Sequence, residues 1–444
     1  MSKSMGRAAA RTLPVLLCLV VSLMRPAAAD GAGARGGRRF ALLVGINRYA
    51  YLPQDKQLEW AVTDAGNVRR MLVQEFGFPQ HAIATLYNEE ATRGRILTAL
   101  REAAALAGRG DVFVLYYSGH GTLFPDSKSE VLDETQVIEE VVDGETGRLK
   151  RLLKPQKFDS AICPTDVGGP SASGKVWRNL ILDDELFDIF AEFTGRGCEV
   201  VLLSDSCNSG SLGRSLSLPG AGARTDRAKG IAARLALGSE FESLPTPRFQ
   251  RARVRTAADL DGRFIAFTAA KDQELAWESS SGGGYFTRAL VSAAAGKNNV
   301  ATFECLFRAL KREVRERKNV QEPQMDTRFF NGAPTNSLFL SYAEPTRLKV
   351  LVKITDAQGR DVPDANFTIF RAGAAPRPNF GAEDVLLLGR SDFGGLYDSG
   401  CPQVARGTYW VVASKRGYRP FEQRVAIEAN APGVAVLRIR LAGL

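Results

Sequence analysis

The sequence predicts an α/β protein with a mostly parallel sheet, followed by a small all-β sandwich. Apolar runs rich in β-branched residues alternate with amphipathic stretches of ten or more residues as far as about residue 342, which is typical of βαβ units. From residue 347 onward, short strands with alternating polarity and turn-forming residues between them replace that pattern, which predicts that the sandwich is antiparallel. A length of 444 residues leaves room for two or three domains. We therefore expect one domain at 38–342 and a second at 347–444.

The expected elements of the first domain follow one another in strand–helix order. Strands are predicted at 40–46, 83–87, 112–117, 199–204, 264–268 and 338–341. Helices are predicted at 58–76, 93–107, 183–193, 285–295 and 302–316. Two long connections interrupt this order: a polar insertion at 122–162, and a stretch at 211–262 that is rich in Arg, Gly, Ala and Ser.

The first 29 residues have the pattern of an export signal. Three basic residues precede a short apolar run at 12–24, and alanines at 27–29 offer small side chains for cleavage. The apolar run is short for a membrane span, although an anchored helix is the alternative interpretation. We expect cleavage near residue 29, export to a periplasm or to the outside of the cell, and no stable membrane insertion.

Composition and cysteine spacing exclude several classes of protein. The net charge of +9 is modest for this length. The sequence has no basic stripe with interleaved aromatic residues, the pattern that would predict nucleic-acid binding. Five of the six cysteines follow the leader, and an odd number without C-x-x-C spacing argues against a disulfide framework and against a zinc site. Cys198 and Cys305 are interpreted as buried, unreactive thiols.

The chemistry is expected at two strand ends, VLYYSGHG at 114–121 and VVLLSDSCNSG at 200–210. Each buried strand breaks there into small polar residues around one reactive side chain, His120 or Cys207. An imidazole can activate a thiol and later protonate a leaving amine. The backbone N–H groups of Gly121 and Cys207 are the expected donors to an oxyanion. Alternatively, His120 is a packed turn residue and Cys207 a small core residue.

These two segments resemble the histidine and cysteine motifs of the caspase-like cysteine peptidases (peptidase family C14), most of all metacaspases and their bacterial relatives. Further segments share the resemblance, which covers about residues 38–342: ALLVGINRY at 41–49, AVTDAGNVRRML at 61–72, CPTD at 163–166, LDDEL at 182–186, FTAAKDQELAWES at 267–279 and GYFTRAL at 284–290. The resemblance implies a caspase-like three-layer sandwich and a cysteine-type endopeptidase. His120 and Cys207 match its catalytic dyad. It also implies that the protein is a monomer.

The resemblance also implies the substrate. Asp64, Ser118 and Asp205 match the positions that line the metacaspase S1 pocket, which accepts arginine or lysine. Two carboxylates around a partly desolvated pocket attract a cationic side chain and repel an acidic one. Without the resemblance, Asp64 would be read as a helix-surface charge and Asp205 as a strand-end cap. The expected partner is a protein or peptide with a basic P1 residue.

A calcium site is a further implication of the resemblance. Asp166, Asp183 and Asp184 match part of the acidic site that activates many metacaspases, and oxygen ligands suit calcium. The segment after Cys207 offers no further acidic ligand, and carboxylates at 183 and 184 would also stabilise a helix start without a metal. The expected chemistry itself requires no cofactor.

Two hypotheses concern the activity of the whole chain. A peptidase that prefers basic residues would find targets in its own stretch 211–262, which carries several arginines and Lys229, so self-processing between about Arg214 and Arg255 is one hypothesis. A plain surface loop is the alternative. The rival function is a catalytically weak caspase-fold scaffold that binds partners through the β-sandwich, for which the sequence names no ligand.

Overall fold

A computed structural model describes residues 37–444 with gaps. The gaps are 126–130, 133–134, 143–148, 156–157, 171–178, 208–225, 232–252, 255–256, 272–273, 296–301, 319, 328, 332–338, 341–346, 372–383, 400–403 and 431–433. The expected leader and most of the stretch 211–262 therefore lie outside the described residues. Among the helices of the described part, none is both long and apolar enough to cross a membrane.

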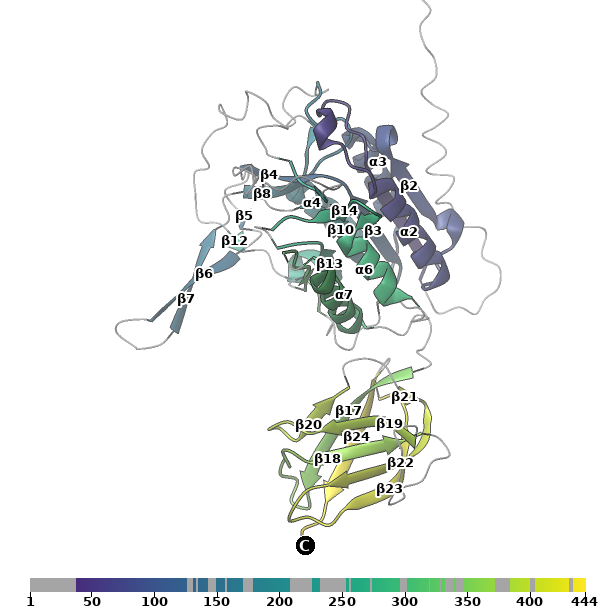
Figure 1. The fold of residues 1–444 in the computed structure, drawn as a ribbon, viewed down its shortest axis with the longest axis vertical. Helices are drawn as coiled ribbons and strands as arrows, with labels where there is room; N and C mark the ends of the chain where they lie inside the picture. Colours follow the sequence, from purple (N-terminus) through teal and green to yellow (C-terminus); the bar gives the residue numbers. More distant parts are fainter. Residues whose placement is uncertain are drawn as a thin grey trace, which may run out of the picture.

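A six-stranded sheet forms the centre of the first domain, in the order β16-β13-β10-β3-β1-β2 (Figure 1). Its strands are β1 (Arg39–Gly45), β2 (Ile83–Tyr87), β3 (Val112–Ser118), β10 (Glu199–Asp205), β13 (Phe264–Thr268) and β16 (Gln324–Asp326). Only the pairing of β16 with β13 is antiparallel among these six strands. The mostly parallel sheet that the sequence predicts is confirmed.

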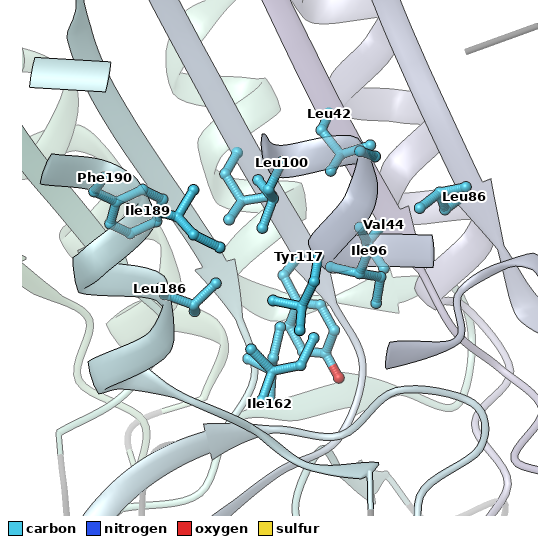
Figure 2. Close-up of a cluster of buried hydrophobic side chains, with 14 of the residues drawn as sticks. Leu42, Val44, Leu86, Ile96, Leu100, Tyr117, Ile162, Leu186, Ile189 and Phe190 are labelled. Carbon is cyan, nitrogen blue, oxygen red and sulfur yellow. The ribbon is translucent and has the colours of Figure 1, made fainter. Parts of the chain in front are cut away.

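Helices cover both faces of this sheet. They are α2 (Ala61–Gln74), α3 (Arg93–Leu106), α4 (Asp183–Gly195), α6 (Tyr285–Ala294) and α7 (Phe303–Arg317), with 3-10 turns at Gln54–Lys56, Gln80–Ala82, Asn88–Glu90 and Ala257–Leu260. Successive side chains of a strand point to opposite faces. Leu42 of β1 therefore packs with the α3 and α4 side, and Leu43 packs with α2, α6 and α7. Figure 2 shows the first of these two layers, in which Leu100 of α3 and Ile189 of α4 lie over the strands.

One predicted strand of the first domain is wrong. Phe339 and Leu340, within the run expected as a strand at 338–341, form a bend, and Leu340 has φ of 52°. Both side chains are buried in the layer that contains α6 and α7, so the run contributes to the core without joining the sheet. The polar segment β16 takes the edge position instead, which apolar patterning could not reveal.

The insertion at 122–162 contains strands that the sequence did not predict. β4 (Gly121–Pro125) begins directly after His120 and pairs with β8 (Phe158–Ile162), which pairs with β9 (Ile181–Leu182). Further strands are β6 (Thr135–Val142) and β7 (Leu149–Pro155), which form a hairpin, and β5 (Val131–Leu132), which pairs with β12 (Arg253–Val254). The first strand of the insertion thus anchors the backbone that follows the histidine.

The chain from residue 347 forms two four-stranded sheets around one apolar core. The first contains β17 (Arg347–Asp356), β20 (Leu396–Asp398), β21 (Val404–Ala405) and β24 (Val434–Leu441). The second contains β18 (Asn366–Phe370), β19 (Val385–Arg390), β22 (Gly407–Ser414) and β23 (Phe421–Ile427). The expectation of antiparallel strands throughout is wrong for β17 and β24, which pair in parallel. Parallel neighbours need a long crossover, which the strands between them in the sequence provide.

Candidate active site

The two reactive residues follow neighbouring parallel strands. Ser118, the last residue of β3, is the register partner of Asp205, the last residue of β10. His120 and Cys207 each come two residues later, so the loops that carry them leave the sheet at the same edge. This is the edge at which open α/β sheets bind ligands.

Hydrogen bonds to His120 determine which of its ring nitrogens can act as a base. Nε2 lies 2.6 Å from the carbonyl oxygen of Lys56, which can only accept, so Nε2 carries the proton. Nδ1 is buried and has no hydrogen-bond partner among the described residues. Burial, the largest effect, lowers the pKa of His120 to about 4. The imidazole is therefore neutral at pH 7, with a free lone pair on Nδ1.

Two tyrosines hold the backbone of His120. The hydroxyl of Tyr49 accepts a hydrogen bond from the His120 N–H at 2.6 Å, and the two rings lie 4.9 Å apart. The hydroxyl of Tyr117 donates to the His120 carbonyl at 2.6 Å. Since both tyrosines are buried, these bonds fix the position of the turn that presents the imidazole.

Cys207 is a buried thiol beside a backbone amide. Its Sγ accepts a hydrogen bond from the N–H of Ala276 at 3.0 Å and lies 3.5 Å from the carbonyl oxygen of the same residue. Burial raises the pKa of Cys207 to about 12, against the smaller stabilising effect of the Ala276 amide. The sulfur is thus a neutral thiol in this state, and it needs a base before it can attack.

The two amides expected to bind an oxyanion both donate to one carbonyl of the same chain. The N–H groups of Cys207 and Gly121 lie 3.0 and 3.1 Å from the carbonyl oxygen of Lys229. Donors at 2.7–3.1 Å are the geometry that stabilises a developing oxyanion. The carbonyl carbon of Lys229 is therefore polarised beside the residue that carries the thiol.

The side chain of Lys229 fills the pocket formed by Asp64, Ser118 and Asp205, which we call the Lys229 pocket. Its Nζ lies 3.0 Å from Asp64 Oδ2, 2.9 Å from Asp205 Oδ2 and 2.9 Å from Ser118 Oγ. All four side chains are fully buried. Burial opposes the charged ammonium, but Asp205 and Asp64 together raise the pKa of Lys229. Burial raises the pKa of Asp64, and the ammonium of Lys229 opposes that rise.

Backbone and hydroxyl donors on the start of α6 hold the two carboxylates. The N–H of Gly284 donates to both oxygens of Asp64, at 3.2 and 3.0 Å. The hydroxyl of Thr287 donates to Asp205 Oδ2 at 2.5 Å. A Cβ atom at Gly284 would collide with the Asp205 carboxylate and with the Lys229 ammonium. Only glycine at 284 therefore leaves room for this charged group.

The backbone on either side of Lys229, which itself lies at a bend, is hydrogen-bonded to the segments around Cys207 and His120. Its own N–H donates to the Ala276 carbonyl at 2.8 Å, and the N–H of Ile231 donates to the Gly121 carbonyl at 3.1 Å. Residues 227–228 form β11, which pairs antiparallel with β14 (Trp277–Ser279), and β14 pairs with β15 (Gly283–Gly284). Residues 227–231 therefore lie as a bound peptide would against Gly121, Cys207, Ala276 and β14, with the Lys229–Gly230 bond beside Cys207. We call the site lined by Gly121, Cys207, Ala276 and β14 the cleft.

The structure brings together the six residues expected at the catalytic centre and the pocket, together with groups that the sequence did not reveal. Lys229 is one of several basic residues in the stretch 211–262, and its sequence does not set it apart. Ala276 and Lys56 contact the site through backbone groups. Backbone donors and acceptors have no side-chain signature. The acidic character of the pocket favours a lysine or arginine of that stretch as its occupant, but it does not distinguish one of them.

The three aspartates expected at a calcium site do not form one within the described residues. Asp166 accepts a hydrogen bond from the N–H of Arg93 at the start of α3, and Asp183 accepts from the N–H groups of Ser160 and Asp184. In the described ranges, no three His, Cys, Asp or Glu side chains come close enough to hold a metal ion. The carboxyls of Asp166 and Asp183 bind backbone amides, as carboxylates at helix starts commonly do.

The interpretation of Cys305 as an unreactive free thiol is wrong. Cys305 takes part in a disulfide bond, whereas Cys163, Cys198 and Cys207 are free. The odd number of cysteines after the leader argued against a disulfide framework, but it does not exclude a single disulfide bond. Cys198 is a buried free thiol, as expected.

Comparison with known proteins gives the family. The family model of the caspase domain, Peptidase C14, matches residues 38–331. Metacaspase-7 of Arabidopsis thaliana is 32% identical over 177 residues, which are 39% of this chain and 35% of that protein. Metacaspase-1 of Schizosaccharomyces pombe is 30% identical over 189 residues, 41% of this chain and 36% of that protein. Thus the chain spans about a third of the length of these curated relatives.

A solved structure, Caspase-1 from Spodoptera frugiperda, is 11% identical with a TM-score of 0.39, and the match covers 72% of this chain and 97% of that one. The family model spans more than half of the 444 residues. The chain therefore belongs to the caspase-domain family of peptidases, peptidase family C14.

Proposed function

We propose that this protein is a cysteine endopeptidase that cleaves after lysine or arginine. One observation carries the proposal: the Lys229 ammonium is bound between Asp64 and Asp205, while the carbonyl of the same residue accepts from the amides of Cys207 and Gly121. Asp205 Oδ1 has no hydrogen-bond partner among the described residues, so it offers an acceptor for the additional N–H groups of an arginine.

The proposed reaction uses only groups of the chain. The sulfur of Cys207 attacks the carbonyl carbon, and its proton passes to Nδ1 of His120. The amides of Cys207 and Gly121 hold the oxyanion, and the Lys56 carbonyl stabilises the imidazolium through Nε2. The imidazolium then gives its proton to the leaving amine as the C–N bond breaks. Water, deprotonated by the same imidazole, hydrolyses the thioester and restores the thiol.

We further propose that the chain cleaves itself at the Lys229–Gly230 bond. This position lies within the stretch 211–262 and narrows the self-processing hypothesis to one bond. The support is that the side chain of Lys229 already lies in the pocket and its carbonyl accepts from both amides. On the other side of the bond, the N–H of Ile231 donates to the Gly121 carbonyl and so holds the leaving segment. Until that bond is cut, the segment blocks the cleft, so the uncut chain is expected to be a latent enzyme.

A fluorogenic peptide assay tests the proposed function. Under reducing conditions, the protein should hydrolyse a peptide that ends in arginine or lysine and should leave a matched peptide ending in aspartate intact. Hydrolysis of neither peptide would favour the rival function, a catalytically weak scaffold that binds through its β-sandwich. Equal hydrolysis of both peptides would contradict the proposed specificity.

The pocket carboxylates predict a specificity change. Asp205→Asn keeps the size of the side chain and removes one of two charges that face a cationic P1 residue. Losing one partner of a buried charge pair costs about 2–5 kcal/mol, so kcat/KM for lysine and arginine peptides should fall about a hundredfold. The rate for a glutamine peptide, which has no charge to lose, serves as the control and should change less than threefold. An equal fall for all three peptides would show a structural defect instead.

The buried histidine predicts a loss of stability in acid. The folded chain keeps His120 neutral, with a pKa of about 4, whereas the unfolded chain protonates it near pH 6.5. The unfolded state therefore binds more protons below pH 6.5, and stability falls from there to pH 4, by about 3 kcal/mol. Urea unfolding measures the free energy of unfolding at each pH, in the Cys207→Ala variant because that chain should stay uncut. Adding His120→Gln should flatten the profile, and the control His81→Gln, in an exposed turn, should not.

We also propose export of the protein and a monomeric state. Support for export comes from the leader pattern and from the disulfide bond at Cys305, since disulfides persist in oxidising compartments. Mass spectrometry of protein recovered outside the cytoplasm should give a mature chain that begins near residue 30. No nucleic acid, cofactor or metal takes part in the proposed reaction.

A further inference from the structure

Two charged side chains precede Lys229, and each meets the opposite charge on the wall of the cleft. With Lys229 as P1, the residue before the proposed cleavage, Arg227 is P3 and Asp226 is P4. Both lie in the described segment 226–231, outside the Lys229 pocket. Their contacts show what the cleft offers to a bound peptide beyond P1.

Asp226 is held by three donors. Its Oδ2 lies 2.7 Å from Lys318 Nζ and 2.9 Å from the hydroxyl of Tyr285, and its Oδ1 accepts from the N–H of Ser280 at 3.2 Å. The Lys318 ammonium also lies 4.5 Å from the centre of the Trp277 ring. The side chains of Asp226 and Lys318 are each only 21% exposed. Hydrogen bonds between charged groups are stronger when they are shielded from water, so this is a well-defined site for one carboxylate.

Arg227 meets a weaker, more exposed site. Its Nη2 lies 2.6 Å from Glu59 Oε1, and its Nη1 donates to the Gln57 carbonyl at 2.7 Å. The side chains of Arg227 and Glu59 are 40% and 49% exposed. Exposed ion pairs contribute little because water screens them. A P3 preference should therefore be smaller than a P4 preference.

The backbone pairing of this segment does not depend on its side chains. β11 joins β14 as an antiparallel strand, with Arg227 opposite Glu278 and Ala228 opposite Trp277. Any extended peptide can form such main-chain bonds, and pockets for individual side chains then provide the selectivity. The charged groups around P3 and P4 are thus the features that distinguish one sequence from another.

We propose that the cleft selects substrates by charge at three positions. Lys318, with Tyr285, selects Asp or Glu at P4; Glu59 selects Arg or Lys at P3; and the Lys229 pocket selects P1. The substrates are then exposed protein segments with an acidic residue at P4 and basic residues at P3 and P1. This inference rests on the proposed peptidase function. If the contacts only dock residues 226–231 of the same chain, peptide rates will not depend on P3 or P4.

Four fluorogenic peptides test the proposal with the full-length protein after self-cleavage under reducing conditions. The reference is Asp-Arg-Ala-Lys, the sequence of residues 226–229. The others carry Lys at P4, Glu at P3 or Asp at P1. Compared with the reference, kcat/KM should fall at least tenfold for Lys at P4 and about threefold to fivefold for Glu at P3.

A charge reversal on the protein gives the sharper test. Lys318→Glu should reverse the P4 preference, so that the Lys peptide becomes the better substrate. Arg315→Glu is the matched control, because it makes the same charge change at an exposed position in the last turn of α7, the helix that Lys318 caps, and it should keep the preference for Asp. Self-cleavage should follow the same rule: Asp226→Lys should slow it, and adding Lys318→Glu should restore it.

The outcomes separate this proposal from the proposed function. Hydrolysis of all three peptides with P1 lysine at equal rates, or an unchanged P4 preference in Lys318→Glu, would overturn the selection at P3 and P4 and leave the peptidase intact. If Arg315→Glu also reverses the P4 preference, the cause is a long-range charge effect, and the proposed selection by Lys318 is equally overturned. If the protein hydrolyses none of the peptides, or if Cys207→Ala hydrolyses them equally well, the peptidase function is overturned, and this proposal with it.

Discussion

Replacing Cys207 with alanine is expected to abolish both peptide hydrolysis and self-cleavage. The proposed reaction forms a bond to this sulfur, and alanine offers no nucleophile. Removing the nucleophile of a hydrolase commonly lowers kcat by about 10⁴-fold or more. The hydrolysis rate of an arginine peptide and the fraction of full-length chain after incubation measure the two activities. Both should fall to the background of a reaction without enzyme.

Cys198→Ala is the matched control for this variant. Cys198 is also a buried free cysteine, directly before β10, the strand that ends next to Cys207, but it lies at the other end of the strand. The Cys198→Ala protein should keep both activities to within a few fold. If Cys207→Ala retained peptide hydrolysis at the level of the control, Cys207 would not be the nucleophile.

Lys229→Met should block self-cleavage and destabilise the uncut chain. Methionine keeps much of the apolar length of the side chain but leaves the carboxylates of Asp64 and Asp205 buried together without a cation. Removing one partner from a buried ion pair costs about 3–5 kcal/mol. Urea unfolding in the Cys207→Ala background, where the chain stays intact, measures this loss. With active Cys207, the rate of cleavage after residue 229 should fall at least a hundredfold.

The charge explanation of this loss has its own controls. Lys229→Arg restores a cation, so it should keep most of the stability and the self-cleavage. Without the ammonium, the pKa of Asp64 should rise further, because burial and Asp205 both disfavour its charged form. The folded Lys229→Met chain then binds more protons than the unfolded chain, so its deficit in stability should shrink as the pH falls from 7 to 5. A deficit that is constant over this range would contradict the charge explanation.

The sequence was sufficient to predict five of the six strands of the sheet and the placement of His120 and Cys207 at one edge of it. An apolar strand such as β2 has a clear boundary, because the turn-forming residue Asn88 follows it directly. Parallel pairing then puts the carboxyl ends of β3 and β10 at one edge, so His120 and Cys207 could be expected there together. Local patterning and one topological rule carry this part of the prediction.

The sequence was not sufficient to predict what fills the cleft. Lys229 is separated by 165 residues from Asp64 and by 111 from Ser118, and no local pattern distinguishes it from the other basic residues nearby. The amide of Ala276 and the carbonyl of Lys56 belong to the backbone, which every residue has. The bend at Phe339 looked like a strand because apolar periodicity cannot separate a short core-filling run from a buried strand.

The most direct test of the proposed site is the identity of the bond that the purified protein cuts in itself. Intact-mass and N-terminal analysis of the protein after incubation under reducing conditions gives that bond. We predict one new fragment that begins at Gly230, present for the unmodified chain and absent for Cys207→Ala. Fragments that begin elsewhere, or the same fragments from both proteins, would contradict the assignment of Lys229 as the residue poised for cleavage.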